Sequence, residues 1–391
     1  MSIPPLQKSD HLPLVHMNFK QIGGISQMTE HLQIFNLSIE DCYKIFYEKG
    51  YQFEEIISTN SRFGVVVKLQ QIATKRFVAC KIAKESNDSY LSFGKNEAKS
   101  IQKAFFLSQG LSIEFLEEFT FMDHHAIITS YGGDNLLNAF VKKTEPLSIS
   151  TITDFLTTAL DYYDRVFTAK FEHNDIKPEN IVYDGKTFRF IDFGDWRKIG
   201  SKSIPLRISQ YWRTPSVAKE NVDGSATSFS LGCVLAEILT RQPLFLEICK
   251  KEVSDNFLSI EHFLLVFNFI PLTENPHSST EKASNSPIID YVENMKTTLG
   301  DKEKHLIDNS VIPMLTEGFV ENRFLTLVKN RIATNNLDIG SISEEAFQDQ
   351  LVSFLKLMLS YDTPPDPKAL QEHPFVYLCK SECQQKDQQY A

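Results

Sequence analysis

Two short polar segments hold residue types that could carry chemistry together. In the first, residues 173–180 (HNDIKPEN), Asp175 is followed by Lys177 and then by Asn180. In the second, the sequence IDFG, the acid is Asp192. Apolar residues flank the first segment, which indicates a polar loop held between buried elements. The two segments therefore predict a site that combines carboxylates, an amide and a cation.

Phosphoryl transfer needs these parts. The transferred group is multiply anionic, so its site must supply positive charge and position the attacking hydroxyl. Carboxylate and amide oxygens suit Mg²⁺, a hard ion, which makes Asn180 and Asp192 the natural metal pair on chemical grounds alone. A lysine on a strand can hold nucleotide phosphates if a glutamate fixes its ammonium group. Upstream, Lys81 ends the sequence VACK, and Glu97 follows on a predicted helix.

The elements that must position these residues are predicted from hydrophobic patterns. Ser38 to Asp41 resemble a capping box that opens a helix, and Gly50 ends it. A polar turn is expected over 58–62. The other expected elements are strands over 51–57, 65–69, 76–82, 115–121 and 126–130, and helices over 95–108, 152–168 and 227–239. A strand-rich first part followed by a helix-rich second part predicts an α+β fold of two lobes.

In their order and spacing, these motifs resemble those of a eukaryotic protein kinase over roughly residues 51–379. The resemblance implies a bilobal fold, with a small β-rich N-lobe (51–131) and a larger, mainly helical C-lobe (132–379). It also implies a role for each site residue: Lys81 contacts the α- and β-phosphates and pairs with Glu97, Asp175 is the catalytic base, Lys177 neutralises the γ-phosphate, Asn180 holds one Mg²⁺ and Asp192 holds the main one. A lysine at position 177 is similar to the serine/threonine type.

Further segments resemble the CMGC group, which comprises the cyclin-dependent, MAP and DYRK-like kinases. Residues 209–216 resemble the segment that closes the activation loop, and residues 230–239 resemble the buried central helix of the large lobe. Residues 260–267 resemble a helix after which this group carries an insertion, and residues 272–345 would supply one.

The same resemblance implies where ATP binds. Residues 127–136 align with the connector between the lobes, which makes Thr129 the gatekeeper. The backbone of Ser130 and Tyr131 would then meet adenine. The other expected nucleotide contacts are Gly64, Val66, Ala79, Lys81 and Val182.

Several positions depart from the family pattern. Thr59 and Ser61 stand where two glycines normally let backbone N–H groups approach phosphates, so we expect weaker ATP binding. Asn174 replaces an arginine that grips a phosphate on the activation loop, which argues against activation by phosphorylation of that loop. Ser216 replaces a glutamate. Thr227 replaces an aspartate that braces the catalytic loop, and its hydroxyl can replace only part of that hydrogen bonding.

Two functions from different classes follow. The first is an active serine/threonine kinase that transfers the γ-phosphate of Mg-ATP to protein hydroxyl groups. The alternative is a pseudokinase that serves as a scaffold or structural component of a larger assembly, which the glycine positions taken by Thr59 and Ser61 and the departures at Asn174, Ser216 and Thr227 favour. A small-molecule kinase is disfavoured because residues 211–216 and 230–245 resemble machinery for protein substrates.

Composition further narrows the possible classes of protein. The chain has 391 residues, 42% of them hydrophobic, which suits a large core rather than global disorder. Its net charge of −10 argues against nucleic acid or anionic membranes as main partners. No apolar run is long enough to span a membrane, and no secretory signal opens the chain. None of the six cysteines forms a CxxC pair, which indicates a reduced intracellular protein.

The expected organisation has four parts. Residues 1–36 form an N-terminal extension, residues 37–50 a helix that leads into the kinase-like domain, residues 51–379 the domain itself, and residues 380–391 a tail. A stable protein assembly would form through residues 1–36 or 272–345. We expect a cytoplasmic location, with the cytoskeleton or a cilium as the alternative.

Overall fold

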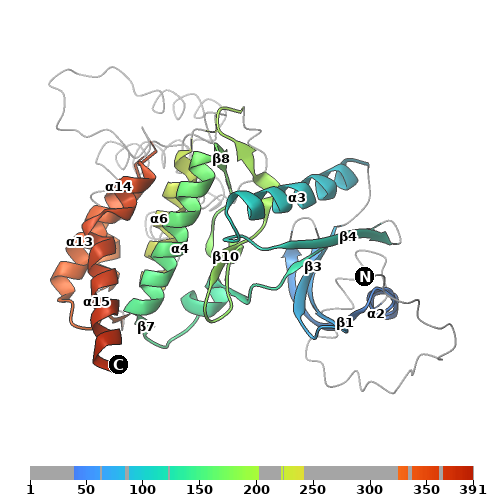
Figure 1. Ribbon diagram of the computed structural model, residues 1–391, viewed down its shortest axis with the longest axis horizontal. Coiled ribbons are helices and arrows are strands. Elements are labelled where there is room, and N and C mark those ends of the chain that lie inside the picture. Colours follow the sequence, from blue (N-terminus) through green and yellow to red (C-terminus); the bar gives the residue numbers. More distant parts are fainter. Residues whose placement is uncertain are drawn as a thin grey trace, which may run out of the picture. The chain divides into compact units, whose positions relative to one another are not determined.

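The computed structural model describes residues 39–61, 64–83, 88–121, 124–201, 222, 224–241, 325–332, 337–360 and 364–390. These residues divide into two compact units (Figure 1). The first unit holds the described residues up to Leu91 and Glu117–Thr129, and the second holds Ser92–Leu116 and the described residues from Ser130 onward. A sheet dominates the first unit and helices dominate the second, which confirms the expected α+β class.

The first unit is built on a five-stranded sheet with the order β1-β2-β3-β5-β4. The strands are β1 (Tyr51–Ser61), β2 (Gly64–Gln71), β3 (Phe77–Ala83), β4 (Phe115–Phe121) and β5 (His124–Ser130). β2 pairs antiparallel with both β1 and β3. All five strands were expected, and β4 has the predicted bounds.

The end of β1 differs from the prediction. The stretch expected as a turn over 58–62 is largely strand, because Ser58 pairs with Val66 and Ser61 pairs with Gly64. Register shifts interrupt the ladder along this stretch. Serine, threonine and asparagine are typical of turns, but here the pairing with β2 outweighs the local preference.

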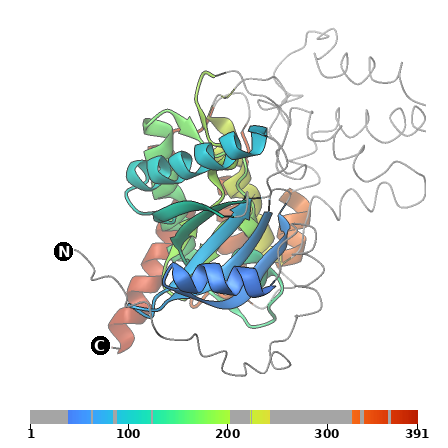
Figure 2. The ribbon, with the colours of Figure 1, turned by 90° about the vertical axis from the view of Figure 1, so that its right-hand side faces the viewer.

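Helix α2 (Ile39–Glu48) packs against one face of this sheet (Figure 2). It ends at Gly50, whose φ of +87° is the left-handed conformation that commonly closes a helix. Alternate residues of β2 and β3 face α2 and are buried against its side chains. The α2 residues are Cys42 and Phe46, and the strand residues are Val65, Val67, Leu69, Val78, Cys80 and Ile82. Each such side chain contributes about 1.5–3 kcal/mol when fully buried. The residues between them lie on the opposite face, where Val66, Ala79 and Lys81 are half-buried.

The second unit is mainly helical. Its helices are most of α3 (Asp88–Leu107), η2 (Leu137–Val141), α4 (Ile149–Thr168), α6 (Ser225–Thr240), α12 (Leu325–Ile332), α13 (Glu344–Met358), α14 (Pro367–Gln371) and α15 (Pro374–Tyr390). α3 begins earlier than predicted, because serine and glycine between residues 88 and 95 are weak helix formers that hide its first turns. Among the described helices, none is long and apolar enough to cross a membrane.

Short strands and 3₁₀ turns connect these helices and carry the polar segments. The strands are β6 (Asp134–Asn135), β7 (Leu147–Ser148), β8 (Phe171–Glu172), β9 (Ile181–Tyr183), β10 (Phe188–Phe190), β11 (Arg197–Lys198) and β12 (Leu337–Asp338), and the turns are η3 (Pro178–Asn180) and η4 (Phe193–Asp195). They form three small sheets, β10-β9-β6, β11-β8 and β12-β7. The segment from residue 173 to residue 180 therefore leaves β8 and enters β9 through η3.

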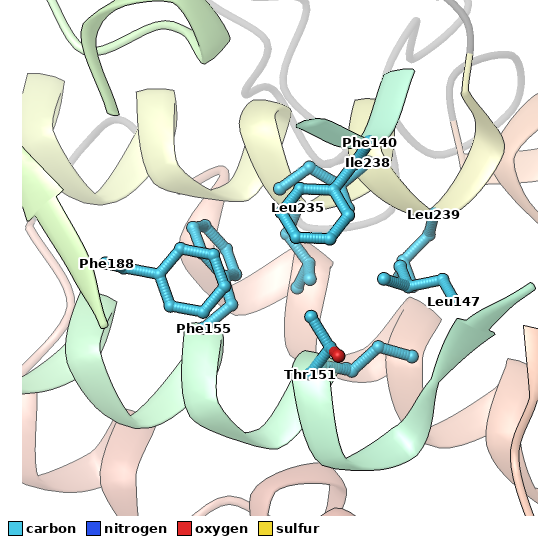
Figure 3. A pocket seen from close by; sticks show the side chains of 9 residues that line it. Phe140, Leu147, Thr151, Phe155, Phe188, Leu235, Ile238 and Leu239 are labelled. Atoms are coloured by element: carbon cyan, nitrogen blue, oxygen red, sulfur yellow. The ribbon is translucent and has the colours of Figure 1, made fainter. Parts of the chain in front are cut away.

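The core of the second unit lies between α4 and α6. Every residue of α6 is buried, as its apolar sequence predicts. Apolar side chains from α4, α6, η2 and β10 surround a small cavity of about 10 Å³, among them Phe155, Phe188 and Leu235 (Figure 3). That volume is roughly the room of one water molecule, so the cavity is a packing void of the core rather than a ligand site.

Candidate active site

Two of the expected site residues, Lys177 and Asn180, converge on one carboxylate oxygen of a third, Asp175. Nζ of Lys177 lies 2.9 Å from Oδ2 of Asp175, and Nδ2 of Asn180 donates to the same oxygen at 2.8 Å. The amide of Asn180 also donates to the backbone carbonyl of Asp175 at 2.8 Å. The side chain of Asp175 is thus held in one orientation by a cation and an amide from its own loop.

Lys177 carries a stable positive charge in this loop. Burial by itself lowers the pKa of the ammonium group, but the carboxylates of Asp175, Asp192 and Glu179 outweigh it, so the pKa lies above its ordinary value. A charge that is fixed at neutral pH suits contact with an anionic group.

His173 connects the loop to the second polar segment and is fully buried. Its Nδ1 accepts the backbone N–H of Asp175 at 3.3 Å, so the proton is on Nε2, which lies 3.0 Å from the carbonyl oxygen of Ile191. Burial lowers the pKa of the imidazole, despite the charges of Asp175 and Asp192. The ring is therefore neutral and structural.

Asp192 is brought to the same part of the second unit. The backbone N–H of Ile191 donates to the carbonyl oxygen of Asn180 at 3.0 Å, which joins the two polar segments. Asp192 itself has φ 63° and ψ 72°, a left-handed conformation that costs a non-glycine residue roughly 1–2 kcal/mol. Such strain concentrates at functional sites, where the surroundings hold it in place.

The donor set fits a magnesium ion. Asn180 uses its amide nitrogen for Asp175, which leaves its amide oxygen as a ligand for a hard cation, and Asp192 adds a carboxylate. In the described part of the chain no group of three or more His, Cys, Asp or Glu side chains could hold a metal. Two protein oxygens are sufficient for Mg²⁺, since this ion keeps several water molecules and takes other ligands from substrate phosphates.

The nucleotide contacts expected in the first unit share one face of its sheet. Val66 pairs with Lys81 across β2 and β3, and Ala79 lies two residues from Lys81 on the same face. Gly64 begins β2, where an added Cβ would lie 1.8 Å from the carbonyl oxygen of Ile82. Close approach of two backbones therefore requires a glycine there, whether or not a nucleotide binds.

Thr129 and Glu97 are both buried, on β5 and α3 respectively. Lys81 belongs to the first unit and Glu97 to the second. The pairing of Lys81 with Glu97 stays a prediction.

The expected adenine connector is packed against β9. An added Cβ at Gly132 would lie 2.3 Å from a methyl group of Val182, so the chain after Tyr131 rests on that side chain. The backbone N–H of Ser130 donates to the carbonyl oxygen of Glu114 at 2.9 Å. An adenine contact at Ser130 would therefore have to use its carbonyl oxygen.

Asn174 fastens the loop instead of gripping a phosphate. Its Nδ2 donates to the carbonyl oxygens of Glu172 at 3.2 Å and of Asp195 at 3.0 Å. Its φ of 63° is left-handed, which asparagine tolerates better than most residues. This neutral amide joins the segment that follows Asp192 to the strand that precedes the loop.

The sequence analysis missed Glu172, the second residue of β8. Its side chain has no exposed surface, and its carboxylate accepts the backbone N–H of Thr227 at 3.1 Å. The only sequence signal was an acid between an aromatic residue and the first histidine of the polar loop. The hydroxyl of Thr227, which could replace only part of the hydrogen bonding of an aspartate, is buried with no hydrogen-bond partner among the described residues.

Some of the expected motifs lie outside the described residues. They are the segments 1–36, 209–216, 260–267 and most of 272–345. The side chains of Thr59 and Ser61 are also outside the described set.

Comparison with known proteins bears on the whole chain. The protein kinase domain family matches residues 57–375. Dual specificity protein kinase YAK1 of Saccharomyces cerevisiae is 28% identical over 221 residues, which cover 54% of this chain and 27% of the yeast protein. Human dual specificity tyrosine-phosphorylation-regulated kinase 3 is 28% identical over 210 residues, covering 50% of this chain and 34% of the relative.

A third similar protein is the human MAPK/MAK/MRK overlapping kinase. It is 29% identical over 192 residues, which cover 47% of this chain and 45% of the relative. The chain therefore spans less than half the length of these three curated relatives. They are kinases of the CMGC group, as the sequence resemblance implies.

Proposed function

We propose, because this chain belongs to the protein kinase family, that it is an active serine/threonine kinase that uses Mg-ATP and phosphorylates protein hydroxyl groups. The observation that carries the proposal is the convergence of Lys177 and Asn180 on one carboxylate oxygen of Asp175. A merely structural loop has no need of a buried acid, a fixed cation and an amide at one point.

In the proposed reaction, Asp175 accepts the proton of the attacking hydroxyl. The two donors on its Oδ2 hold the carboxylate in one orientation, which is what a general base needs before its substrate arrives. Lys177 contributes positive charge where the transferred phosphoryl group becomes more anionic. Asn180 and Asp192 would hold Mg²⁺, which supplies further positive charge to the phosphates when it is bound.

The nucleotide would lie along the half-buried face of the first sheet. Gly64, Val66 and Ala79 would contribute apolar contacts there, and Lys81 would meet the phosphates with Glu97 as its partner. Val182 is the further proposed adenine contact. Thr129, the carbonyl oxygen of Ser130 and the backbone of Tyr131 complete the proposed adenine contacts.

The alternative is a pseudokinase that acts as a scaffold in a cytoplasmic assembly, bound through residues 1–36 or 272–345. The substitution of two glycines by Thr59 and Ser61 favours it. A thermal-shift titration separates the two functions. Stabilisation by ATP that depends on Mg²⁺ supports the enzyme, and no shift at millimolar nucleotide supports the scaffold.

Phosphate transfer to generic protein substrates tests the proposed activity directly. The full chain is incubated with labelled ATP and Mg²⁺, beside Asp175→Asn and Asp192→Asn. Asp349→Asn is the matched control, since Asp349 forms an exposed ion pair with Lys329. We expect losses of about 100-fold or more in the first two variants and none in the control. Transfer that persists unchanged in Asp175→Asn and Asp192→Asn would refute the assignment.

A further inference from the structure

A buried carboxylate stands directly before the catalytic loop. Glu172 has no exposed surface, and its two oxygens face backbone donors: Oε1 accepts from the N–H of Thr227 at 3.1 Å, and Oε2 from that of Gly224 at 3.4 Å. An ionised group without solvent is tolerated only where donors or opposite charge surround it. These two contacts therefore help to stabilise the buried carboxylate of Glu172.

The two donors lie at the start of α6: Gly224 is its N-terminal cap, and Thr227 belongs to its first turn. The first four N–H groups of a helix have no partner within the helix, and they form its positive end. A residue at the N-terminal cap normally satisfies one of them with its own side chain, but the cap here is Gly224, which has none. Glu172 caps α6 from another strand.

Gly224 cannot easily be replaced by a residue that caps the helix itself. Its φ is +92°, and an added Cβ would lie 2.7 Å from a ring carbon of Phe167. The backbone that leads into α6 thus leaves the capping task to Glu172.

The backbone around Glu172 connects this anchorage to Asp175, the proposed catalytic base. The carbonyl oxygen of Glu172 accepts from Asn174, which also holds Asp195. The next residue, His173, accepts the backbone N–H of Asp175. A short run of bonded groups therefore connects the buried helix α6 to Asp175.

We propose that Glu172 is a positioning residue that braces the catalytic loop against α6. In the family pattern, an aspartate at the position of Thr227 does this from the helix. Here the carboxylate is on the strand and the donors are on the helix, so the same junction is held with the polarity reversed. The hydroxyl of Thr227 takes no part, since it has no hydrogen-bond partner among the described residues. The effect on catalysis rests on the proposed kinase activity.

A positioning role predicts a particular kinetic pattern. Removal of the carboxylate in Glu172→Ala lets the loop shift, so kcat falls by about 10- to 100-fold, because small displacements of a catalytic group are costly. The KM for ATP changes less than about threefold, because Glu172 is not one of the proposed nucleotide or substrate contacts.

A polarity-swap variant gives the decisive measurement. Thr227→Asp alone adds a second buried carboxylate beside Glu172, and the repulsion lowers kcat and stability. In the double variant Glu172→Ala/Thr227→Asp, the single carboxylate is on the helix side, and kcat returns to within about threefold of wild type. Glu345→Gln, an exposed glutamate in the first turn of α13, is the control and leaves kcat unchanged.

Melting curves and hydrogen exchange of the full chain accompany the kinetics. In Glu172→Ala the amides of residues 173–180 exchange faster, and in the double variant their protection returns. If Glu172→Ala fails to fold, Glu172→Gln replaces it, since it keeps the shape and loses the charge. Wild-type kcat in the folded single variant, or a double variant no better than either single one, overturns the proposal. If the wild-type chain transfers no phosphate, the proposed function fails, and the exchange pattern alone still decides the role of Glu172.

Discussion

The side-chain amide of Asn180 donates to a carboxylate oxygen of Asp175 at 2.8 Å. Its other N–H is committed as well, because Nδ2 also donates to the backbone carbonyl of Asp175. The amide oxygen is then the part of Asn180 that can meet a metal ion. One asparagine can therefore serve the proposed base and the proposed Mg²⁺ site together, which an aspartate at this position could not do.

Asn180→Asp tests this double use. The change places a second carboxylate 2.8 Å from the first, and the repulsion between two such carboxylates strongly raises the pKa of one of them. The shared proton disables Asp175 as a base, so kcat falls by about 100-fold or more, and the remaining activity increases towards alkaline pH. A pH–rate profile measures both effects. Asn138→Asp, at an exposed residue of η2, is the matched control. An unchanged profile in Asn180→Asp contradicts the argument.

The bonds of Asn174 predict that the segment after Asp192 does not need phosphorylation to be held in place. Because Asn174 holds the carbonyl oxygen of Asp195 without a phosphate, treatment of the purified chain with a phosphatase should leave kcat unchanged.

Asn174→Arg restores the family residue, but it loses two hydrogen bonds and puts arginine at φ 63°. We expect it to lower the free energy of unfolding by about 1–3 kcal/mol, measured by urea denaturation. A tenfold loss of activity after phosphatase treatment would contradict the expectation that kcat does not depend on phosphorylation.

The sequence predicts well the elements whose burial follows from the pattern of their own apolar and polar residues. β4 was predicted at its observed bounds, Phe115–Phe121, because its side chains alternate between the two faces of the sheet. α6 was predicted over 227–239 and is observed as Ser225–Thr240, because residues 231–239 are apolar apart from Glu237. The end of β1 was not predictable, since only the pairing of Ser61 with Gly64 reveals it.

The site shows the same division between local and distant information. Asp175, Lys177 and Asn180 lie within six positions of one another, so their meeting could be expected from spacing. Glu172 could not be assigned, because its donors are 52 and 55 residues away along the chain. The sequence near residue 172 carries no signal that a distant helix, capped by a glycine, places two backbone N–H groups beside its carboxylate.

Gly64 is predicted to be essential for the first unit in the absence of any nucleotide. In Gly64→Ala the new Cβ would meet the carbonyl oxygen of Ile82 at 1.8 Å, and a backbone atom cannot give way as a flexible side chain can. We expect a loss of roughly 2–4 kcal/mol in the free energy of unfolding. Denaturant titration in the absence of ATP measures this loss. Gly185→Ala is the matched control: it has φ +94° but open space around it, so only about 1–2 kcal/mol of backbone strain is expected. Equal losses in the two variants would argue against the close approach of β2 and β3.

Glu237 should make the stability of the chain fall as pH rises. It is buried in α6, and its Oε2 has no hydrogen-bond partner among the described residues. Burial, helped by the negative charge of Glu179, raises its pKa to about 8. Between the ordinary carboxyl pKa and that value the folded chain keeps a proton that the unfolded chain has released. The free energy of unfolding therefore falls with rising pH in this window, by at most about 1.4 kcal/mol per pH unit.

The isosteric change Glu237→Gln removes the titration and keeps the shape. Urea unfolding from about pH 5 to about pH 9 should show the variant gaining stability over wild type up to roughly pH 8, with a constant difference above it. Glu345→Gln, at an exposed position, should differ from wild type by a constant amount throughout. Parallel stability curves for wild type and Glu237→Gln would mean that Glu237 is already ionised in the folded chain, and that the environment of α6 supplies it with a donor or a cation.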